Sequence, residues 1–204
     1  MLSIPTEESI TVEWFNACFA KAGLTGEVNG FDAARVGTGQ IGKCVRYTLR
    51  FKDQGELHKS VIGKFPSDDE NSRQTGVVLL NFLKEVKFYQ ELQHRVAIKT
   101  PRCFFAEIRD QGPEFFLLLQ DLAPAEQGNQ LAGCSPQVAK AALAELVGLQ
   151  APAWCDETLH DLQWLRDAEV VALVNTMDLY RQTLPGFIDR YGAHLAADEI
   201  AIIK

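Results

Sequence analysis

The chain has 204 residues, of which 47% are hydrophobic and 23% are charged, and these proportions are ordinary for a globular protein rather than a disordered one. Its 20 basic and 27 acidic residues give a net charge of -7, which argues against binding to nucleic acid through a basic surface. No apolar run approaches the roughly 20 residues needed to cross a bilayer, and the first residues lack the basic and apolar regions of a signal peptide. We therefore expect a cytoplasmic protein without a membrane or nucleic-acid partner.

The cysteines and histidines do not indicate a metal site or a disulfide framework. The 5 cysteines are odd in number and widely spaced, with no C-x-x-C pair. The 4 histidines are scattered and do not combine with cysteines at ligand spacing. We expect buried free thiols in a reducing compartment.

The first part of the chain predicts a helix followed by antiparallel strands. Residues 9–22 place apolar side chains at a mostly helical spacing that ends at Gly23. The pattern then changes to short β-branched and aromatic stretches separated by glycines. We expect strands over residues 30–36, 43–51 and 58–65.

The next part predicts one long helix and two further strands. Apolar side chains recur at helical spacing from Val77 to Leu92, and the helix would end near His94. Residues 102–109 and 114–119 are typical of strands joined by a polar turn. The predicted fold class is α+β, with a five-stranded antiparallel sheet and one long helix.

Beyond Leu122 the chain predicts helices only. Ser135 and Pro136 are typical of a helix start, with serine as the cap and proline in the first turn. We therefore divide the chain into a first lobe over residues 1–122 and a set of following helices over residues 123–204.

Three glycines form the pattern G-x-G-x-x-G at Gly37, Gly39 and Gly42. Glycines let backbone amides approach phosphate oxygens because no side chain stands between them. In a dinucleotide-binding fold the motif opens a helix, whereas residues 44–51 alternate like a strand. The segment also matches the P-loop pattern G-x-x-x-x-G-K-[ST] except at its last position, where Cys44 replaces the serine or threonine. A hairpin that covers a nucleotide between two strands fits better, and a plain surface hairpin is the alternative.

A lysine and a glutamate follow this hairpin in the order that kinases use. Lys64 ends an apolar strand, as the lysine of V-A-I-K does where it holds nucleotide phosphates. Glu85 lies on the predicted helix and can pair with Lys64, which would direct the ammonium toward phosphates. Glu91 competes for this role, but Glu85 flanks the packing face of the helix and is preferred. Taken alone, Lys64 would be read as a solvated residue at a strand end.

An apolar strand then runs into the polar residues Gln120 and Asp121, followed by Leu122. The exposed backbone groups of such a strand end can hydrogen-bond the edge of an adenine. Asp121 can equally well cap the turn that follows, and the sequence leaves both interpretations open.

These segments together resemble the aminoglycoside phosphotransferase-like kinases, and within them the ecdysteroid kinase-like (CHK kinase-like) branch. The resemblance covers most of residues 28–165 and is carried by residues 36–42, 61–66, 85–89 and 117–122, and by residues 141–151 with Trp154. The chain departs from the family in having Gln120 in place of a glutamate and Gln150 in place of a histidine.

The resemblance implies a protein-kinase-like N-lobe followed by the first helices of a helical C-lobe. It also implies transfer of phosphate from ATP, bound with magnesium, to a hydroxyl of a small molecule. The implied nucleotide-binding residues are Gly37, Gly39, Gly42, Lys64, Glu85, Gln120, Asp121 and Leu122.

The chain lacks the later H-x-D and the metal-binding aspartate that such enzymes use. We therefore expect it to contain the N-terminal part of such a kinase, with no catalytic residue or metal ligand of its own, and to be inactive alone. The alternative is a non-catalytic kinase-like module that binds a nucleotide or a partner. Apolar helix surface left uncovered would also favour a homodimer.

Overall fold

The computed structural model describes residues 2–37, 39, 41–129 and 131–203, without the side chains of residues 168–175. The chain divides into two compact units, Met1–Asp161 and Leu162–Lys204. Across the described residues, no helix has both the length and the apolar character needed to cross a membrane.

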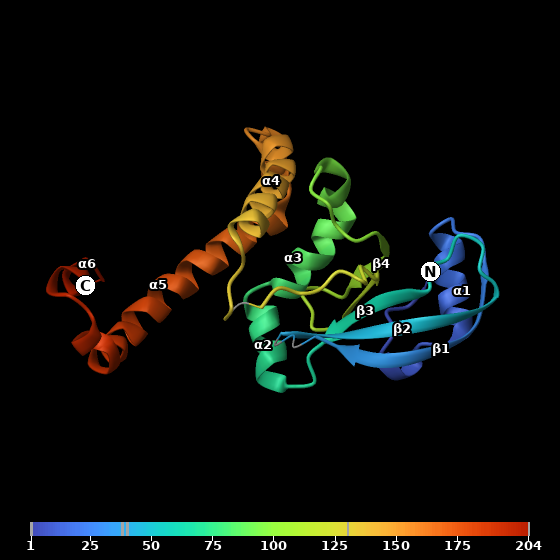
Figure 1. Cartoon of the computed structure of the whole chain (residues 1–204), viewed down its shortest axis with the longest axis horizontal. Coiled ribbons are helices and arrows are strands. Elements are labelled where there is room, and N and C mark those ends of the chain that lie inside the picture. The colour runs from blue at the N-terminus through green and yellow to red at the C-terminus, as the bar shows by residue number, and fades with distance from the viewer. Residues whose placement is uncertain (1, 38, 40, 130, 204) are drawn as a thin grey trace. The chain divides into compact units, whose positions relative to one another are not determined.

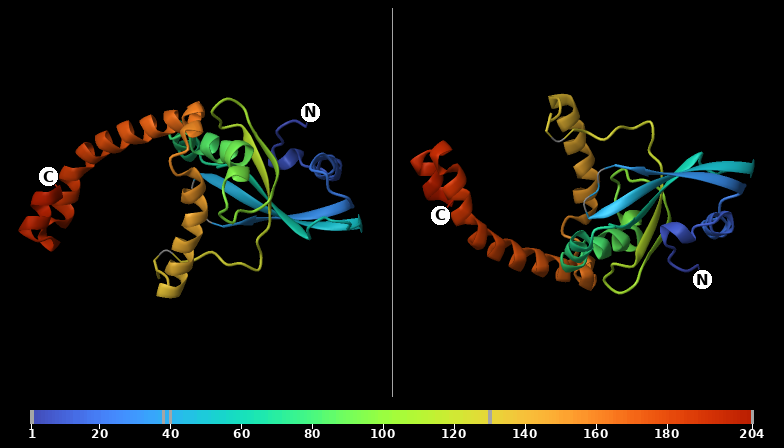
Figure 2. Two further views of the ribbon diagram at one scale, coloured as in Figure 1. Left: turned by 90° about the horizontal axis from the view of Figure 1, so that it is seen from above. Right: turned by 90° about the horizontal axis from the view of Figure 1, so that it is seen from below.

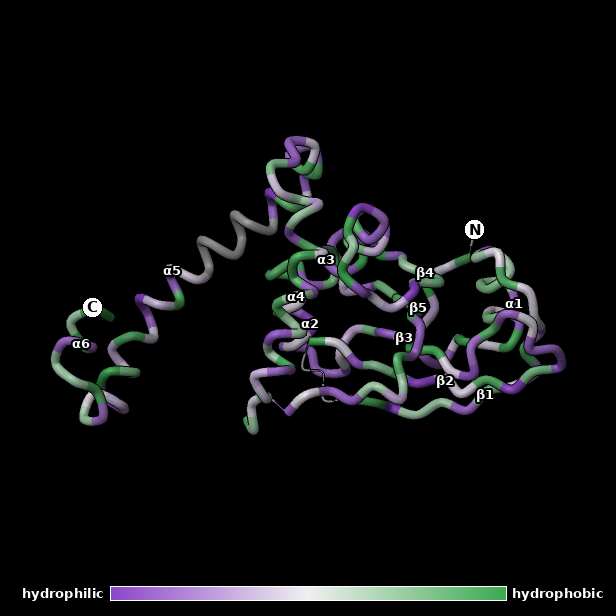
Figure 3. The backbone as a smooth tube through the Cα atoms, turned by 45° about the horizontal axis from the view of Figure 1, so that its top comes forward, coloured by the Kyte–Doolittle hydropathy of each residue, from purple (hydrophilic) through white to green (hydrophobic). Residues whose placement is uncertain are grey.

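The first unit is built on a five-stranded sheet (Figure 1). Its strands run in the order β1-β2-β3-β5-β4, and all neighbouring strands are antiparallel. The predicted α+β class and antiparallel sheet are therefore confirmed. Hydrophobic and hydrophilic residues mix along β1 and β2 (Figure 3), as half-buried strands require. The strands are β1 Glu27–Val36, β2 Gly42–Asp53, β3 Ser60–Pro66, β4 Cys103–Ile108 and β5 Phe115–Gln120.

Helix α1, Val12–Lys21, packs on one face of the sheet (Figure 2). The short 3-10 helix η1, Glu7–Ser9, precedes it. The Thr11 side chain caps α1 by accepting a hydrogen bond from the Trp14 backbone N–H at 3.2 Å. Phe15 is fully buried and meets the Tyr47 ring edge-on at a centroid distance of 5.2 Å. This aromatic contact joins α1 to β2 in the larger of the two hydrophobic clusters.

The opposite face is covered by two helices rather than by the single long helix predicted for this stretch. Helix α2 spans Glu70–Val78 and α3 spans Asn81–Lys87, followed by a π-helical turn η2 Phe88–Leu92 and a 3-10 turn η3 Gln93–Arg95. The break falls at Leu80, which has a φ of 54° in the left-handed region.

Packing explains this break. A Cβ atom on Gly76 would lie 2.3 Å from the Phe82 ring, so α2 and α3 meet at these two residues. The same residues would point to different sides of an unbroken helix. The turn also buries Leu80 and lets Phe82 stack on Phe115 of β5 at 4.6 Å. These contacts outweigh the cost of about 1–2 kcal/mol for a left-handed leucine.

Helix α4, Pro136–Ala153, begins as the sequence predicts, because the Ser135 side chain accepts a hydrogen bond from the Val138 N–H at 3.3 Å. The helix docks on the segment before β4, where the Ala97 N–H donates to the Gly148 carbonyl at 2.8 Å. The 3-10 turn η4, Glu157–Asp161, closes this unit. The second unit contains α5 Gln163–Tyr191, η5 Gly192–His194 and α6 Ala197–Ile203.

All 5 cysteines are free, but they are not all buried as predicted. Cys18 is buried and Cys44 and Cys103 are partly buried, whereas Cys134 and Cys155 are exposed. Burial raises the pKa of the Cys18 thiol to about 12. The two exposed thiols flank α4, outside the sheet and its hydrophobic clusters.

Candidate functional site

Lys64 of β3 and Glu85 of α3 form an ion pair. The Lys64 Nζ lies 2.6 Å from each carboxylate oxygen of Glu85. The competing residue Glu91 instead pairs with Lys87 at 2.7 Å. The sequence-based preference for Glu85 as the partner of Lys64 is therefore confirmed.

The alternation of β3 decides which face Lys64 occupies. Ile62 and Lys64 share one face of the strand, and Val61, Gly63 and Phe65 share the other. Gly63 makes this arrangement possible, because a Cβ atom there would lie 2.8 Å from the Tyr47 ring and 3.0 Å from the Phe116 ring. The role of Gly63 carries no sequence signal, since those two rings reach it only after three strands have paired.

The glycine-rich segment connects β1 to β2 beside Lys64. Gly37 has a φ of +74°, which favours glycine, and a Cβ atom on Gly39 would lie 2.3 Å from the Gly42 carbonyl oxygen. A Cβ atom on Gly42 would lie 3.5 Å from the Lys64 Cε, so β2 begins against the lysine side chain. Thr38 and Gln40 of the motif lie outside the described residues.

The ends of the two hairpin strands are held by a charge cluster. Asp68 accepts hydrogen bonds from Arg35 at 3.0 Å and from Lys43 at 2.6 Å. Lys43 also pairs with Glu7 at 2.7 Å. The hydrogen bond from Lys43 is the main cause that holds the pKa of Asp68 below its usual value. Because Asp68 is 61% exposed, solvent screens its ion pairs and they add little to the stability of the fold.

Asp121 follows β5 and makes more contacts than the sequence predicts. Its Oδ1 accepts from the Ala123 N–H at 3.0 Å, so the turn cap, one of the two interpretations that the sequence leaves open, is present. Its Oδ2 accepts from the Arg46 Nε at 2.6 Å and from the Ser60 Oγ at 2.8 Å. The Asp121 side chain is only 4% exposed. Arg46 and Ser60 carried no recognisable sequence signal, because only the strand register brings them to Asp121.

These contacts keep Asp121 ionised. Burial on its own would raise the pKa of the Asp121 carboxyl, but hydrogen bonds from Arg46, Ser60 and the Ala123 backbone lower that pKa overall. The carboxylate thus ties β2 and β3 to the segment after β5.

A cavity of about 550 Å³ lies between the glycine-rich segment and the end of β5. Its walls include the cleft-facing side chains of Cys44, Arg46 and Ile62. Burial raises the pKa of the Cys44 thiol, which therefore stays neutral at this wall. Of the predicted nucleotide-binding residues, those that line the cavity are Gly37, Gly39, Gln120, Asp121 and Leu122.

The remaining predicted residues lie beside the cavity rather than in its lining. Lys64 follows Ile62 on the same strand face and stands opposite Cys44 in the pairing of β2 with β3. Glu85 pairs with the Lys64 ammonium, and a Cβ atom on Gly42 would lie next to the Lys64 side chain. The structure therefore brings the eight predicted residues into one region, with the ion pair at its edge.

No group of three or more histidine, cysteine, aspartate or glutamate side chains is placed to hold a metal ion among the described residues. No protein-family model matches the sequence, and no curated protein matches it either.

Proposed function

We propose that the chain is the nucleotide-binding part of an ATP-dependent phosphotransferase that acts on a hydroxyl of a small molecule. One observation carries the proposal: the Lys64–Glu85 ion pair lies beside a cavity that is bounded by a glycine-rich hairpin and by a strand end. This combination fits a ligand that presents phosphates to the lysine and a planar base to the strand end.

The ion pair leaves Lys64 able to bind an anion. An ammonium group has three N–H donors, and two of its contacts go to Glu85. The Lys64 side chain is 27% exposed, so it is accessible to a ligand without moving. Glu85 would hold the ammonium in place while a phosphate oxygen accepts a hydrogen bond from the remaining N–H.

The size of the cavity also fits a nucleotide. Small-molecule sites span about 300–1,000 Å³, and this cavity of about 550 Å³ lies within that range. Backbone amides near Gly37 and Gly39 would face the phosphates, and the Gln120–Leu122 backbone would bind adenine. Magnesium would arrive with the phosphates, because the described side chains form no cluster that could hold it.

A second candidate function is a kinase-like module that binds nucleotide without transferring phosphate. The sequence contains no H-x-D, which is the pattern that supplies the catalytic base in kinases. Under this alternative the cavity and the ion pair serve binding alone.

Calorimetric titration with Mg-ATP tests the proposal, using the wild type, Lys64→Ala and the control Lys59→Ala. Lys59 is exposed and precedes the same strand. Losing a charge-assisted bond of about 1.5–3 kcal/mol would weaken binding roughly 10- to 150-fold in Lys64→Ala. Lys59→Ala should bind as the wild type does. Equal affinity in all three proteins, or no binding by any of them, would refute a nucleotide site here.

The coding sequence beyond Lys204 separates the two candidate functions, because this chain is expected to be inactive alone under both. A reading frame that continues with an H-x-D and a later aspartate would favour the phosphotransferase. A stop codon would favour the non-catalytic module.

A further inference from the structure

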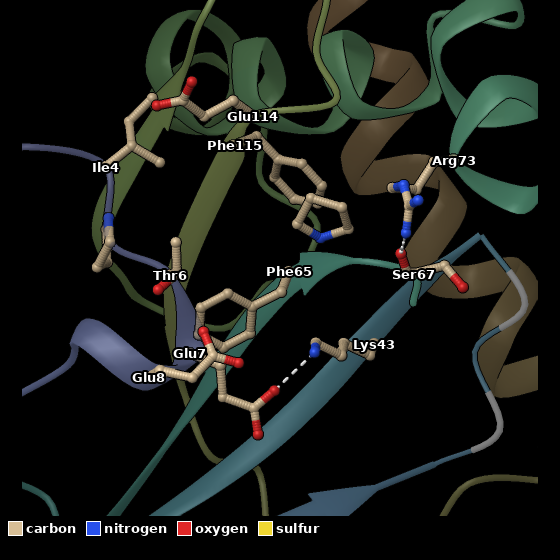
Figure 4. Close-up of a pocket in the computed structure, with 12 residues that line it drawn as sticks. Ile4, Thr6, Glu7, Glu8, Lys43, Phe65, Ser67, Arg73, Glu114 and Phe115 are labelled. Atoms are coloured by element: carbon tan, nitrogen blue, oxygen red, sulfur yellow. Dashed lines mark hydrogen bonds and ion pairs between the residues drawn. The ribbon is translucent and has the colours of Figure 1, made fainter. Parts of the chain in front are cut away.

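A second, smaller cavity lies away from the proposed nucleotide site. It is open to solvent and is bounded by residues 4–8 of the N-terminal segment, the end of β3, Arg73 of α2 and the start of β5 (Figure 4). Its apolar walls are formed by Ile4, Phe65, Pro66 and Phe115. We call it the Phe65 cavity.

The aromatic walls of the Phe65 cavity are held in place by ring contacts. Phe65 packs on Phe116 with a centroid distance of 4.6 Å, and Phe115 stacks on Phe82 at the same distance. All four rings are buried. The cavity is therefore preformed, and an occupant would not have to order its walls.

The volume of the Phe65 cavity indicates what size of group it accepts. It holds about 230 Å³, which is below the range of about 300–1,000 Å³ typical of sites for whole small molecules. An apolar protein cavity of about 150 Å³ is large enough for benzene. One aromatic side chain is therefore the best match in size.

The basic residues at the Phe65 cavity are already neutralised within the chain. Lys43 pairs with Glu7 at 2.7 Å and with Asp68 at 2.6 Å. The Nη1 of Arg73 donates to the carbonyls of Ser67 and Asp68, at 2.9 and 2.8 Å. The Nη2 of Arg73 pairs with Glu70. An acidic occupant would therefore find no unpaired cation.

Three glutamates line the rim, and one of them, Glu7, is already paired with Lys43. Figure 4 shows the carboxylates of Glu7, Glu8 and Glu114 around the opening. Glu8 forms no ion pair with a basic side chain in the described part of the chain, and a hydrogen bond from its own backbone is the main cause of its lowered pKa. Glu114 pairs with Arg109 at 2.6 Å and remains 45% exposed. Glu8 and the exposed part of Glu114 therefore remain at the rim to meet a basic occupant.

We propose that the Phe65 cavity docks one aromatic side chain from a basic segment of a partner protein. The aromatic ring enters beside Ile4 and Pro66, the wall residues that are only partly buried, and the flanking basic residues meet Glu8 and Glu114. An aromatic anchor in a preformed pocket is the usual centre of a protein interface. This role is independent of the nucleotide site.

A fluorescein-labelled peptide, Lys-Arg-Phe-Arg-Lys, tests the proposal by fluorescence anisotropy with the whole chain. A second peptide has alanine in place of phenylalanine. We expect the phenylalanine peptide to bind at least about tenfold more tightly, because the ring accounts for much of the binding energy. Equal affinity for the two peptides, or no binding of either, would overturn the proposal.

Charge reversal at the rim locates the binding. Glu8→Lys should weaken binding of the phenylalanine peptide about fivefold or more, because it replaces attraction with repulsion. Glu13→Lys is the matched control, since Glu13 is also exposed, also lies in the first turn of a helix and also has a lowered pKa. Equal losses in the two variants would show attraction to the acidic chain as a whole and would contradict the assignment. Circular dichroism confirms that each variant is folded.

Discussion

Both carboxylate oxygens of Glu85 lie 2.6 Å from the Nζ of Lys64, so a single ion pair connects α3 to β3. The two residues are 21 positions apart in the sequence. Their contact depends on the helix packing with its buried face on the sheet, where Val86 is fully buried next to Glu85. The proposed nucleotide site is therefore sensitive to how α3 packs.

Replacement of Glu85 by glutamine tests the positioning of Lys64. Glutamine keeps the shape but removes the charge, so Lys64 should be held less firmly toward the phosphates. We expect Mg-ATP affinity to fall by about 1 kcal/mol, roughly fivefold, as measured by calorimetry. Glu91→Gln is the control, because Glu91 pairs with Lys87 instead. If both variants bind Mg-ATP as the wild type does, Glu85 has no positioning role.

Replacement of Gly63 by alanine tests the packing behind Lys64. The new methyl group would lie within 3.0 Å of the Tyr47 and Phe116 rings, and such overpacking costs about 1–3 kcal/mol. Urea denaturation should show this loss in the free energy of unfolding. Gly128→Ala is the control, since no atom lies within 4 Å of the position of its new methyl group. Unchanged stability in Gly63→Ala would mean that the two rings can move aside.

The charge of Asp121 should make stability depend on pH in the acidic range. The pKa of Asp121 is lower in the folded protein than its ordinary value, so the unfolded chain binds its proton more readily. The carboxylate thus stabilises the fold above pH of about 4, and this contribution disappears as the pH falls through the folded pKa.

Asp121→Asn isolates this contribution. We expect the variant to be less stable at pH 7 by about 1 kcal/mol, because Arg46 and Ser60 lose a charged acceptor. Urea denaturation of both proteins at several pH values should show the difference shrinking below pH of about 4. A difference that stays constant down to pH of about 2 would contradict the stabilising role of the ionised form.

The free thiols offer an independent test of the proposed nucleotide site. Cys134 and Cys155 are exposed and should react quickly with a thiol reagent, whereas buried Cys18 should react only on unfolding. Cys44 lines the larger cavity, so Mg-ATP should slow its reaction by occupying that space. Mass spectrometry can follow the rate at each cysteine, and Mg-ATP should leave the reaction rate of Cys134 unchanged. If Mg-ATP slows the reaction of Cys134 as much as that of Cys44, or does not slow Cys44 at all, the nucleotide binds elsewhere.

Local patterns in the sequence predict much of the fold. Alternation along residues 43–51 and the glycines around them predict β2, and Ser135 with Pro136 predicts the start of α4. Such signals work because strand alternation and helix capping depend on residues that are close together in the chain. The pairing of Glu85 with Lys64 was predictable for a related reason, since Glu85 flanks the buried face of its helix.

Local sequence patterns are enough to predict the order of the strands along the chain, the glycine-rich hairpin and the residue types available to a phosphate-bearing ligand. Three features appear only in the folded chain: the helix break at Leu80, the hydrogen bonds to Asp121 from Arg46 and Ser60, and the Phe65 cavity. Each of these features joins residues from elements that are distant in the sequence. Their energies arise from side-chain packing and strand register, which exist only once the sheet has assembled.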